Sequence, residues 1–291
     1  MTVLEKNSPC KVNLLLNILG RRPDGFHALE TVFHPVSLYD RLTFTRRPAD
    51  IHLTCSDSSL PTDAGNLVHR AATAFLSAAR ICDGIHIHLE KQIPLAAGLG
   101  GGSGNAATTL LGLNELFGQP LPATKLAELA AALGSDVNFF LQDKPALATG
   151  RGEIIEALNP FPALRGTVFF LIHPGFGIST PWAYQNLARF PAAQNGMPGR
   201  GRKLINLLQT GDLALASQEF YNSLEAPALD KYPILKIYQD FLLTQGAAAT
   251  LMSGSGSTTF AIFREPAAAE TVVEKFKAKF GENCWTAVVR V

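Results

Sequence analysis

The sequence predicts an α+β protein made of two parts, residues 1–160 and 161–291. Residues 1–90 read mostly as strands, and the last of these strands leads into a glycine-rich loop and a helix. The second half alternates helices with strands, an order that indicates an α+β sandwich. With 291 residues the chain is long enough for one large domain or two moderate ones, each with a core of its own.

The first predicted strand carries a polar face. Its residues 12, 14, 16 and 18 are apolar and share one side, whereas Lys11 and Asn13 lie two apart and project to the other side. A turn follows at residues 22–25, Arg-Pro-Asp-Gly, because proline presets φ and glycine accepts a positive φ. Residues 31–38 and 41–45 then read as extended segments.

The next predicted strand is preceded and followed by helices along the sequence. A helix begins at Asn66, and its apolar stripe is formed by Val68, Ala72, Phe75 and Ala79. Residues 85–89 alternate apolar and polar side chains, as a half-buried strand does. After the glycine-rich loop, apolar residues recur at helical spacing from 106 to 117, and Gly118 supplies a stop. A third helix covers residues 124–133 and ends at Gly134.

The second half supplies the remaining elements. Strands are predicted at residues 166–172, 259–263 and 285–289, and helices at residues 203–210, 213–220, 234–245 and 267–280. Residues 192–201 are rich in glycine and proline and show no periodicity, so they predict a mobile surface loop.

Composition excludes several classes of function. The 25 basic and 24 acidic side chains give a net charge of +1 and are spread along the chain, which argues against binding to nucleic acid or to a membrane surface. No apolar run approaches the roughly 18 residues of a spanning helix, and residues 1–6 lack the apolar core of a signal peptide. The four cysteines are widely scattered, as reduced thiols are. We therefore expect a cytoplasmic enzyme acting on a small molecule.

The glycine-rich loop predicts a phosphate site. Residues 98–102 contain four glycines in five positions, between a strand and a helix. Glycines let backbone N–H groups approach an anion, and the first turn of the helix presents unpaired donors. The segment lacks the lysine of a Walker A loop and the third glycine of a dinucleotide fingerprint. A helix follows it where the glycine loop of protein kinases is followed by a strand. The alternative, a tight turn with close packing, needs fewer glycines.

Two other segments carry candidate catalytic groups. The pair Lys11 and Asn13 is either part of a site or a solvated edge of the sheet. Asp136 follows a glycine that ends a helix and precedes an apolar run, so it is either a functional acid or a helix cap. The pair His86 and His88 shares one strand face, but the sequence places no further ligand beside it, and we predict no metal site.

These segments together resemble the GHMP kinases, and most closely the 4-diphosphocytidyl-2-C-methyl-D-erythritol kinase family. The resemblance runs in order from about residue 8 to residue 263. It rests on Pro9-Cys10-Lys11-Val12-Asn13-Leu14, Arg22-Pro23-Asp24-Gly25-Phe26-His27, Asn66-Leu67, the glycine loop with Pro94, Gly134-Ser135-Asp136-Val137, Gly150-Arg151-Gly152-Glu153 and Ser253-Gly254-Ser255-Gly256-Ser257. The Asp-Gly-x-His turn is the most specific of them, because it separates this family from other GHMP kinases. This chain has Phe26 where the family usually has tyrosine.

The resemblance implies a fold and a reaction. The fold would be an N-terminal α/β domain and a C-terminal ferredoxin-like α+β domain, with the active site between them. ATP, as its magnesium complex, would phosphorylate the 2-hydroxyl of the cytidine diphosphate–methylerythritol substrate.

The resemblance also assigns residues to that reaction. Asp136 would be the general base, and Lys11 would position the hydroxyl and offset charge. The substrate would contact Asn13, Phe26, His27 and Thr180. The nucleotide would be bound by Asn66, Pro94, Gly98, Leu99, Gly100, Gly101, Gly102, Ser103, Gly104 and Asn105.

Two other functions remain open at this point. One is another small-alcohol kinase of the same superfamily, such as a homoserine or mevalonate kinase, against which the turn at residues 24–27 argues. The other is a nucleotide-binding regulator without catalysis, against which the presence of both Lys11 and Asp136 argues.

Overall fold

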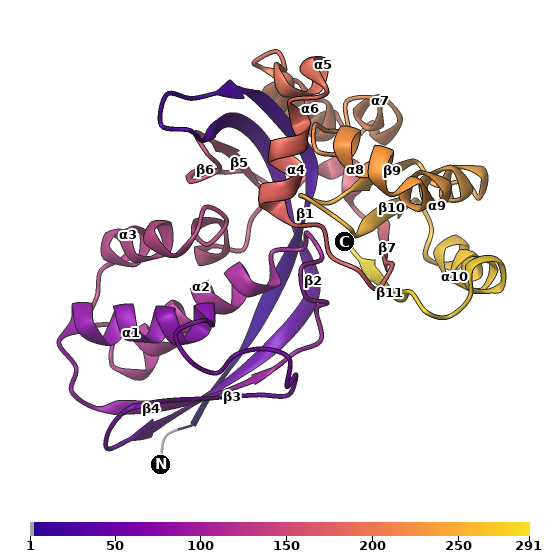
Figure 1. Ribbon diagram of the computed structural model, residues 1–291. Coiled ribbons are helices and arrows are strands. Elements are labelled where there is room, and N and C mark those ends of the chain that lie inside the picture. Colours follow the sequence, from indigo (N-terminus) through magenta and orange to yellow (C-terminus); the bar gives the residue numbers. More distant parts are fainter. Residues whose placement is uncertain (1–2) are drawn as a thin grey trace. The chain divides into compact units, whose positions relative to one another are not determined.

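The computed structural model describes residues 3–291, which form two compact units (Figure 1). Of the described residues, unit 1 contains 3–10, 38–93 and 100–143, and unit 2 contains 11–37, 94–99 and 144–291. The long strands β1 (Val3–Arg21) and β2 (His27–Arg47) contribute residues to both units. Both units are therefore discontinuous in sequence, and the predicted division at residue 160 stays a prediction about family domains.

Unit 1 is a small sheet covered by helices. Strand β4 (Gly84–Glu90) pairs antiparallel with β2 and parallel with β3 (Ile51–Cys55). The connection between β3 and β4 is helix α1 (Leu67–Ala79), the usual crossover between parallel neighbours. Helices α2 (Gly101–Leu116) and α3 (Ala123–Leu133) and the 3₁₀ turn η1 (Asn138–Leu141) complete the unit. The three α-helices lie together on one side of β3 and β4 (Figure 1).

Local signals explain how these helices begin and end. The side chain of Asn66, where a helix was predicted to begin, accepts a hydrogen bond from the Val68 amide at 2.9 Å and so caps α1. Helix α2 lies so close to β2 that a Cβ at Gly112 would meet the Phe44 ring at 2.7 Å. Gly134 follows α3, but its φ of 170° is ordinary extended backbone, so the helix end does not require glycine there.

From residue 144 onwards, unit 2 continues with short strands that pair with β1, β2 or one another, together with the helices and the second sheet. Strand β5 (Ala146–Thr149) pairs with β2 and with β6 (Ile154–Ala157), and β8 (Tyr221–Asn222) pairs parallel with β1. The remaining elements are η2 (Pro162–Leu164), β7 (Val168–His173), α4 (Thr180–Leu187), α5 (Pro191–Gln194), α6 (Arg200–Thr210), α7 (Leu213–Ser217), α8 (Glu225–Lys231), α9 (Pro233–Thr244), β9 (Ala249–Met252), β10 (Thr259–Phe263), α10 (Pro266–Phe280) and β11 (Trp285–Arg290).

The end of unit 2 has the ferredoxin-like arrangement. Strands β7, β9, β10 and β11 form one antiparallel sheet in the order β11-β7-β10-β9. Helix α9 precedes β9, and α10 connects β10 to β11, which completes the strand–helix–strand–strand–helix–strand succession. Both helices bury apolar side chains against the sheet, including Tyr238 from α9 and Phe276 from α10 around Phe170. The expectation of a ferredoxin-like C-terminal part is confirmed.

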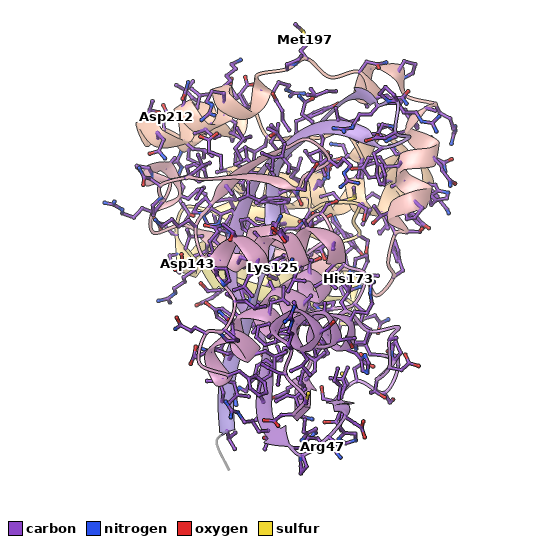
Figure 2. All side chains as sticks on the ribbon, turned by 90° about the vertical axis from the view of Figure 1, so that its left-hand side faces the viewer. Arg47, Lys125, Asp143, His173, Met197 and Asp212 are labelled. Carbon is purple, nitrogen blue, oxygen red and sulfur yellow. The ribbon has the colours of Figure 1, made fainter. Side chains whose placement is uncertain are left out.

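Three predictions about elements were wrong. Residues 27–47 form a single strand rather than two extended segments. Residues 192–201 are not one continuous loop, because they include the end of α5 and the start of α6. Between these helices, Met197 is 77% exposed and projects at the top of Figure 2. Helices α4, α5 and α8 and strands β3, β5, β6, β8 and β9 were not predicted. Within residues 3–291, no helix combines the length and the apolar character needed to cross a bilayer.

Candidate active site

Lys11 and Asn13 lie on β1 and are both buried, at 3% and 2% exposure. The Lys11 ammonium donates to Asn13 Oδ1 at 2.6 Å and to the Gly98 carbonyl at 3.2 Å, and it lies 5.1 Å from the centre of the Phe33 ring. Asn13 Nδ2 donates to Thr31 Oγ1 at 2.8 Å. These contacts exclude the alternative of a solvated sheet edge. They present a cationic group held in place by neutral dipoles and an aromatic face.

The first part of the glycine loop meets the 253–258 segment within unit 2. Ser253 Oγ donates to the Gly98 carbonyl at 2.9 Å, and the Thr258 amide donates to the Ala97 carbonyl at 3.1 Å. Gly98 has a φ of +77°, and a Cβ there would lie 2.1 Å from the Ser253 carbonyl. Only glycine satisfies both conditions. We call the 253–258 segment the third motif. It is not merely a loop, because its Ser253 supports Gly98, whose carbonyl accepts the Lys11 ammonium.

Two residues that sequence reasoning missed, the buried Asn222 and the half-buried Glu225, hold this third motif. Asn222 Nδ2 donates to the carbonyls of Met252 at 2.7 Å and Gly254 at 2.8 Å. Glu225 accepts the Met252 amide at 2.7 Å and the Gln239 side chain at 2.5 Å. Burial raises the pKa of the Glu225 carboxyl above its ordinary value, although these donors oppose the shift. The short sequence Asn-Ser-Leu-Glu carries no periodic signal that would have revealed this role.

The predicted turn between β1 and β2 is confirmed. Gly25 has a φ of +86°. Asp24 accepts the Phe26 amide at 3.2 Å and forms an ion pair with Arg22 at 2.9 Å, and the Arg22 side chain is the main cause that lowers the pKa of Asp24. Phe26 is 54% exposed, with the guanidinium carbon of Arg151 4.6 Å from its ring centre. An exposed aromatic ring beside a cation is suited to stacking on a planar ligand.

His27 and Thr180 complete the predicted substrate residues. The His27 ring lies 5.0 Å from the ring of Tyr184, which belongs to α4. Its Nε2 atom is buried and makes no hydrogen bond to any group in the described part of the chain. Burial is the main cause that lowers the pKa of His27. Thr180 begins the same helix, and its hydroxyl lies 2.9 Å from that of Ser255. Unit 2 thus brings Thr180 to the third motif and His27 to α4.

The second part of the glycine loop forms the start of α2 in unit 1. Gly100 is the N-cap with a φ of +71°, and no described side chain caps this helix. The amides of Gly101, Gly102 and Ser103 are therefore donors without helical acceptors, and the helix dipole favours an anion there. A Cβ at Gly104 would lie 2.5 Å from the Pro9 carbonyl, so packing on β1 requires glycine at that position.

Two predicted nucleotide ligands use their side chains inside the protein. Asn66 caps α1 with its oxygen and donates its amide to the Pro61 carbonyl at 2.8 Å. Asn105 is 2% exposed and donates to Ser8 Oγ and to Asp40, both at 2.9 Å. Direct nucleotide contact through either side chain stays a prediction.

Asp136 is half-buried in the turn between α3 and η1. The residue at the N-cap position of η1 is Val137, which directly follows Asp136, and the functional role of Asp136 stays a prediction. Val137, Phe139 and Phe140 are buried and anchor the turn. A Cβ at Gly104 would be 3.6 Å from Phe140, which shows that η1 packs on the start of α2. Asp136 and the donors of α2 therefore lie on neighbouring elements of unit 1.

Two family models match the chain. The GHMP kinases N terminal domain matches residues 66–149, and the GHMP kinases C terminal domain matches residues 203–282. A 4-diphosphocytidyl-2-C-methyl-D-erythritol kinase of Syntrophotalea carbinolica is 38% identical over 279 residues, 94% of each chain. The chain belongs to this family of GHMP kinases. A Synechococcus relative of the same name is 42% identical over 87% of this chain and 82% of its own length.

A solved structure supports the same membership. The crystal structure of a 4-(cytidine 5'-diphospho)-2C-methyl-D-erythritol kinase has a TM-score of 0.81 and 34% identity, and it covers 99% of this chain and 100% of its own. The two-part GHMP kinase fold is thereby confirmed for this family member. The predicted residues that unit 2 brings together are Lys11, Asn13 and Gly98. Unit 1 holds Asn66, the start of α2 and Asp136.

The histidine pair is part of the β3–β4 surface of this GHMP kinase. The Thr54 hydroxyl lies 3.1 Å from His86 Nε2 and 2.9 Å from His88 Nδ1. The His52 ring is 4.9 Å from that of His86. Among residues 3–291, no group of three or more histidine, cysteine or acidic side chains is arranged to hold a metal ion.

Proposed function

We propose that this protein transfers the γ-phosphoryl group of ATP to the 2-hydroxyl of 4-diphosphocytidyl-2-C-methyl-D-erythritol. The observation that carries the proposal is the 38–42% identity to kinases of that name over most of both chains. The firmly held turn at residues 24–27 supports it, because the substrate assignment depends on that turn. ATP enters as its magnesium complex, so the metal belongs to the substrate. We expect the reaction to take place in the cytoplasm.

The proposed chemistry divides between a base, a cation and a set of amides. Asp136 accepts the proton of the 2-hydroxyl, whose oxygen then attacks the γ-phosphorus while the bond to ADP breaks. Lys11 offsets the charge that spreads over the transferring group. The free amides at the start of α2 bind the phosphates. Phosphoryl transfer depends mainly on positioning and charge stabilisation, which these groups supply without covalent catalysis.

The cytidine end of the substrate is assigned to the turn and α4. Phe26 offers an exposed ring for stacking on the cytosine, and His27 offers a hydrogen bond to its polar edge through its side chain or its backbone. A base–aromatic stack contributes about 1–3 kcal/mol. Asn13 and Thr180 are assigned to the remainder of the substrate.

An ADP-release assay against a panel of alcohols tests the proposal. The cytidylylated substrate should support turnover, whereas homoserine and mevalonate should not. Asp136→Asn keeps the shape of the side chain and removes the base, so turnover should fall on the order of 10²–10⁴-fold while both substrates still bind. Turnover with homoserine or mevalonate alone would overturn the substrate assignment, and near-normal turnover of Asp136→Asn would overturn the role of this residue.

The substrate turn is tested separately. Phe26→Ala should raise KM for the cytidylylated substrate about tenfold, the size that a lost stack implies, and leave KM for ATP unchanged. Phe26→Tyr is the matched control and should retain wild-type KM values. Equal KM values in Phe26→Ala and wild type would remove this ring from the substrate site.

A further inference from the structure

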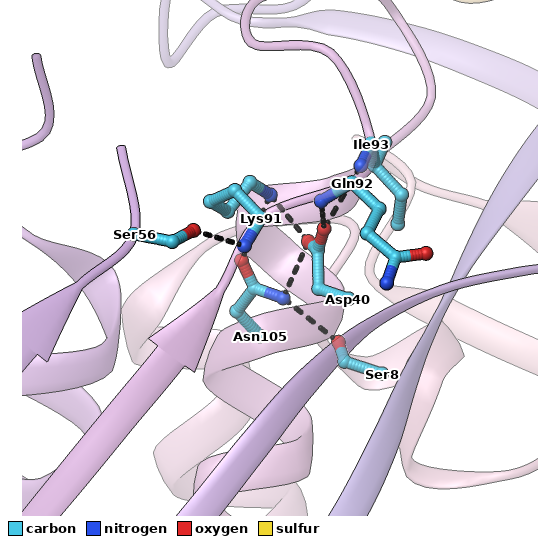
Figure 3. Close-up of polar contacts among 7 residues, drawn as sticks. All are labelled: Ser8, Asp40, Ser56, Lys91, Gln92, Ile93 and Asn105. Carbon is cyan, nitrogen blue, oxygen red and sulfur yellow. Dashed lines mark hydrogen bonds and ion pairs between the residues drawn. The ribbon is translucent and has the colours of Figure 1, made fainter. Parts of the chain in front are cut away.

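A fully buried carboxylate, Asp40 on β2, lies at the centre of a polar network in unit 1 (Figure 3). Its Oδ1 atom accepts the backbone amides of Gln92 at 2.8 Å and Ile93 at 2.9 Å. Its Oδ2 atom accepts the Lys91 ammonium and the Asn105 side-chain amide, the latter at 2.9 Å. Four donors thus converge on one carboxylate, and none of them belongs to its own strand.

The donors to Asp40 lie on both sides of the glycine loop in the sequence. Gln92 and Ile93 are the last residues before the segment 94–104, which contains the glycine loop, and Asn105 is the first residue after it. Asp40 therefore holds both ends of that segment. The contact at the far end is made through a side chain of α2, so it fixes this helix relative to the strand that enters the loop.

Lys91 and Ser8 close the network. The Lys91 ammonium also donates to Asn105 Oδ1 at 3.2 Å, so Asp40, Lys91 and Asn105 contact one another in a ring. Asn105 Nδ2 donates in addition to Ser8 Oγ at 2.9 Å. Asn105 is consequently oriented by contacts on both its oxygen and its nitrogen. The Lys91 side chain is only 6% exposed, which leaves it inside the protein rather than at the surface.

The first turn of α2 rests on the same residues. A Cβ at Gly101 would lie 3.1 Å from the Ile93 side chain and 3.4 Å from the Lys91 ammonium. Any shift of the Asp40 network therefore shifts the amides of the first helical turn. A buried ion pair adds little net stability because desolvation offsets the attraction. Stability alone thus gives no reason for burying two charges at this place, whereas fixing a binding loop does.

We propose that Asp40, together with Lys91 and Asn105, is a positioning group that fixes the α2 amides for the phosphates of ATP. This inference rests on the proposed function, and it assigns Asn105 to the loop rather than to direct contact with the nucleotide. Asp40 itself touches no reacting atom. Its loss should act on ATP affinity and leave the affinity for the second substrate unchanged.

Calorimetric binding of ATP and KM values for both substrates test the inference with single variants. Asp40→Asn puts an amide nitrogen against the donors of Lys91 and Asn105. ATP binding should weaken about tenfold, as the loss of a hydrogen bond to a charged group implies, with KM for the other substrate unchanged. Asn114→Ala is the matched control, because it removes a pair of hydrogen bonds to the Leu121 backbone at the other end of α2. It should lower the melting temperature without changing ATP affinity.

An exchange variant separates positioning from direct contact. Combining Asp40→Asn with Asn105→Asp moves the carboxylate to the helix. The amide oxygen at position 40 can still accept Gln92 and Ile93, and the carboxylate at 105 can accept Lys91 and Ser8. ATP affinity should return to within about threefold of wild type, since the coupled contacts are remade. A carboxylate at 105 would instead repel the phosphates if Asn105 contacted them.

Each result has a distinct meaning. Failure of the wild-type protein to bind ATP would overturn the proposed function, and this inference with it. Binding by wild type with unchanged affinity in both Asp40→Asn and Asn105→Ala would overturn the inference alone. Failure of the exchange variant, if folded, to recover affinity would do the same. Should Asp40→Asn not fold, Asn105→Ala and the exchange variant still decide the question.

Discussion

Two buried lysines, Lys91 in unit 1 and Lys11 in unit 2, contact different parts of the glycine loop and its flanking residues. Lys91 forms an ion pair with the buried carboxylate of Asp40. Lys11 donates to neutral oxygens, those of Asn13 and Gly98, and approaches the Phe33 ring. A carboxylate offsets the charge of the Lys91 cation, and dipoles and an aromatic face help to hold the Lys11 cation in a defined place. The comparison teaches that Lys91 contacts Asp40 and Asn105, which hold the ends of the glycine loop, whereas Lys11 contacts the Gly98 carbonyl of the loop itself.

A third buried ionisable group, His34, is accommodated in another way. It lies on β2 between the rings of Phe161 and Phe169, at 6.1 and 5.6 Å. Burial there lowers the pKa of His34 to about 4, so the imidazole stays neutral at physiological pH. Burial is thus compensated at Lys91 by a carboxylate, whereas His34 is buried as a neutral imidazole.

Replacing Lys91 should have the largest effect on stability. Lys91→Met leaves the Asp40 carboxylate buried without its cation, which costs about 3–5 kcal/mol. The melting temperature should fall on the order of 10 °C for a chain of this size. Calorimetry measures it, and the double variant with Asp40→Asn should recover part of the loss because both charges are then gone. A melting temperature for Lys91→Met within a degree of wild type would contradict the structural role.

Replacing Lys11 should lower the catalytic rate much more than the stability. Lys11→Met should lower kcat on the order of 10²–10³-fold, the usual cost of removing one electrostatic contact to a developing charge. The melting temperature should change little, because Ser253 Oγ still reaches Asn13 Oδ1 at 3.4 Å and the Gly98 carbonyl at 2.9 Å.

Steady-state kinetics and calorimetry on the same sample give both quantities for Lys11→Met. Lys6→Met, at a partly exposed lysine paired with Glu115, is the matched control and should change neither. A folded, fully active Lys11→Met protein with reduced stability would contradict the proposed role of Lys11 in phosphoryl transfer.

His34 should make stability depend on pH below neutrality. Its pKa is about 4 in the folded protein and roughly 6.5 when unfolded, so the unfolded chain binds the proton first as pH falls. The contribution is complete above pH 6.5 and declines towards pH 4 by about 1.4 kcal/mol per pH unit, about 3 kcal/mol in all. Urea unfolding at pH 7.5, 5.5 and 4.5 measures the slope. His34→Phe should flatten it, and an unchanged slope in this variant would assign the dependence to other groups.

The smallest expected effect concerns the phosphate amides themselves. A Cβ at Gly102 would come no nearer than 3.7 Å to Leu67, so Gly102→Ala fits, and it should stabilise α2 by up to about 1 kcal/mol. The added methyl group should nevertheless weaken ATP binding a few-fold by hindering close approach to the amides. Calorimetry measures both effects. Ala132→Gly in α3 is the reverse exchange away from the loop and should lower stability only. Tighter ATP binding by Gly102→Ala would contradict the phosphate assignment.

Patterns between near neighbours in the chain were sufficient for much of the fold. The period of two placed Lys11 and Asn13 on one strand face, and the glycine run between strand 85–89 and a helix located the loop and α2. The strands at 259–263 and 285–290 and the helix between them were also predictable. These features depend on local periodicity, which a single sequence records.

The contacts that hold the glycine loop could not be predicted from local periodicity. The predicted extended segments, residues 31–38 and 41–45, left Asp40 outside both of them, although it lies within β2. The aspartate is buried there because Lys91, Gln92 and Asn105 supply donors from more than fifty positions along the chain. Asn105 was predicted to bind the nucleotide. Only the structure shows that its side-chain amide donates to Ser8 and Asp40.

The sequence by itself determined the strand–glycine loop–helix segment, the polar face of β1 and the family. Each of these is encoded by residue types a few positions apart, whose spacing fixes their direction on a strand or helix. Only the tertiary structure decided that Ser253 supports Gly98 and Asn13, residues 155 and 240 positions away. Only it decided that Lys91 is paired with the Asp40 carboxylate. A polar side chain is buried wherever distant groups satisfy it, and no local pattern records where those groups arrive.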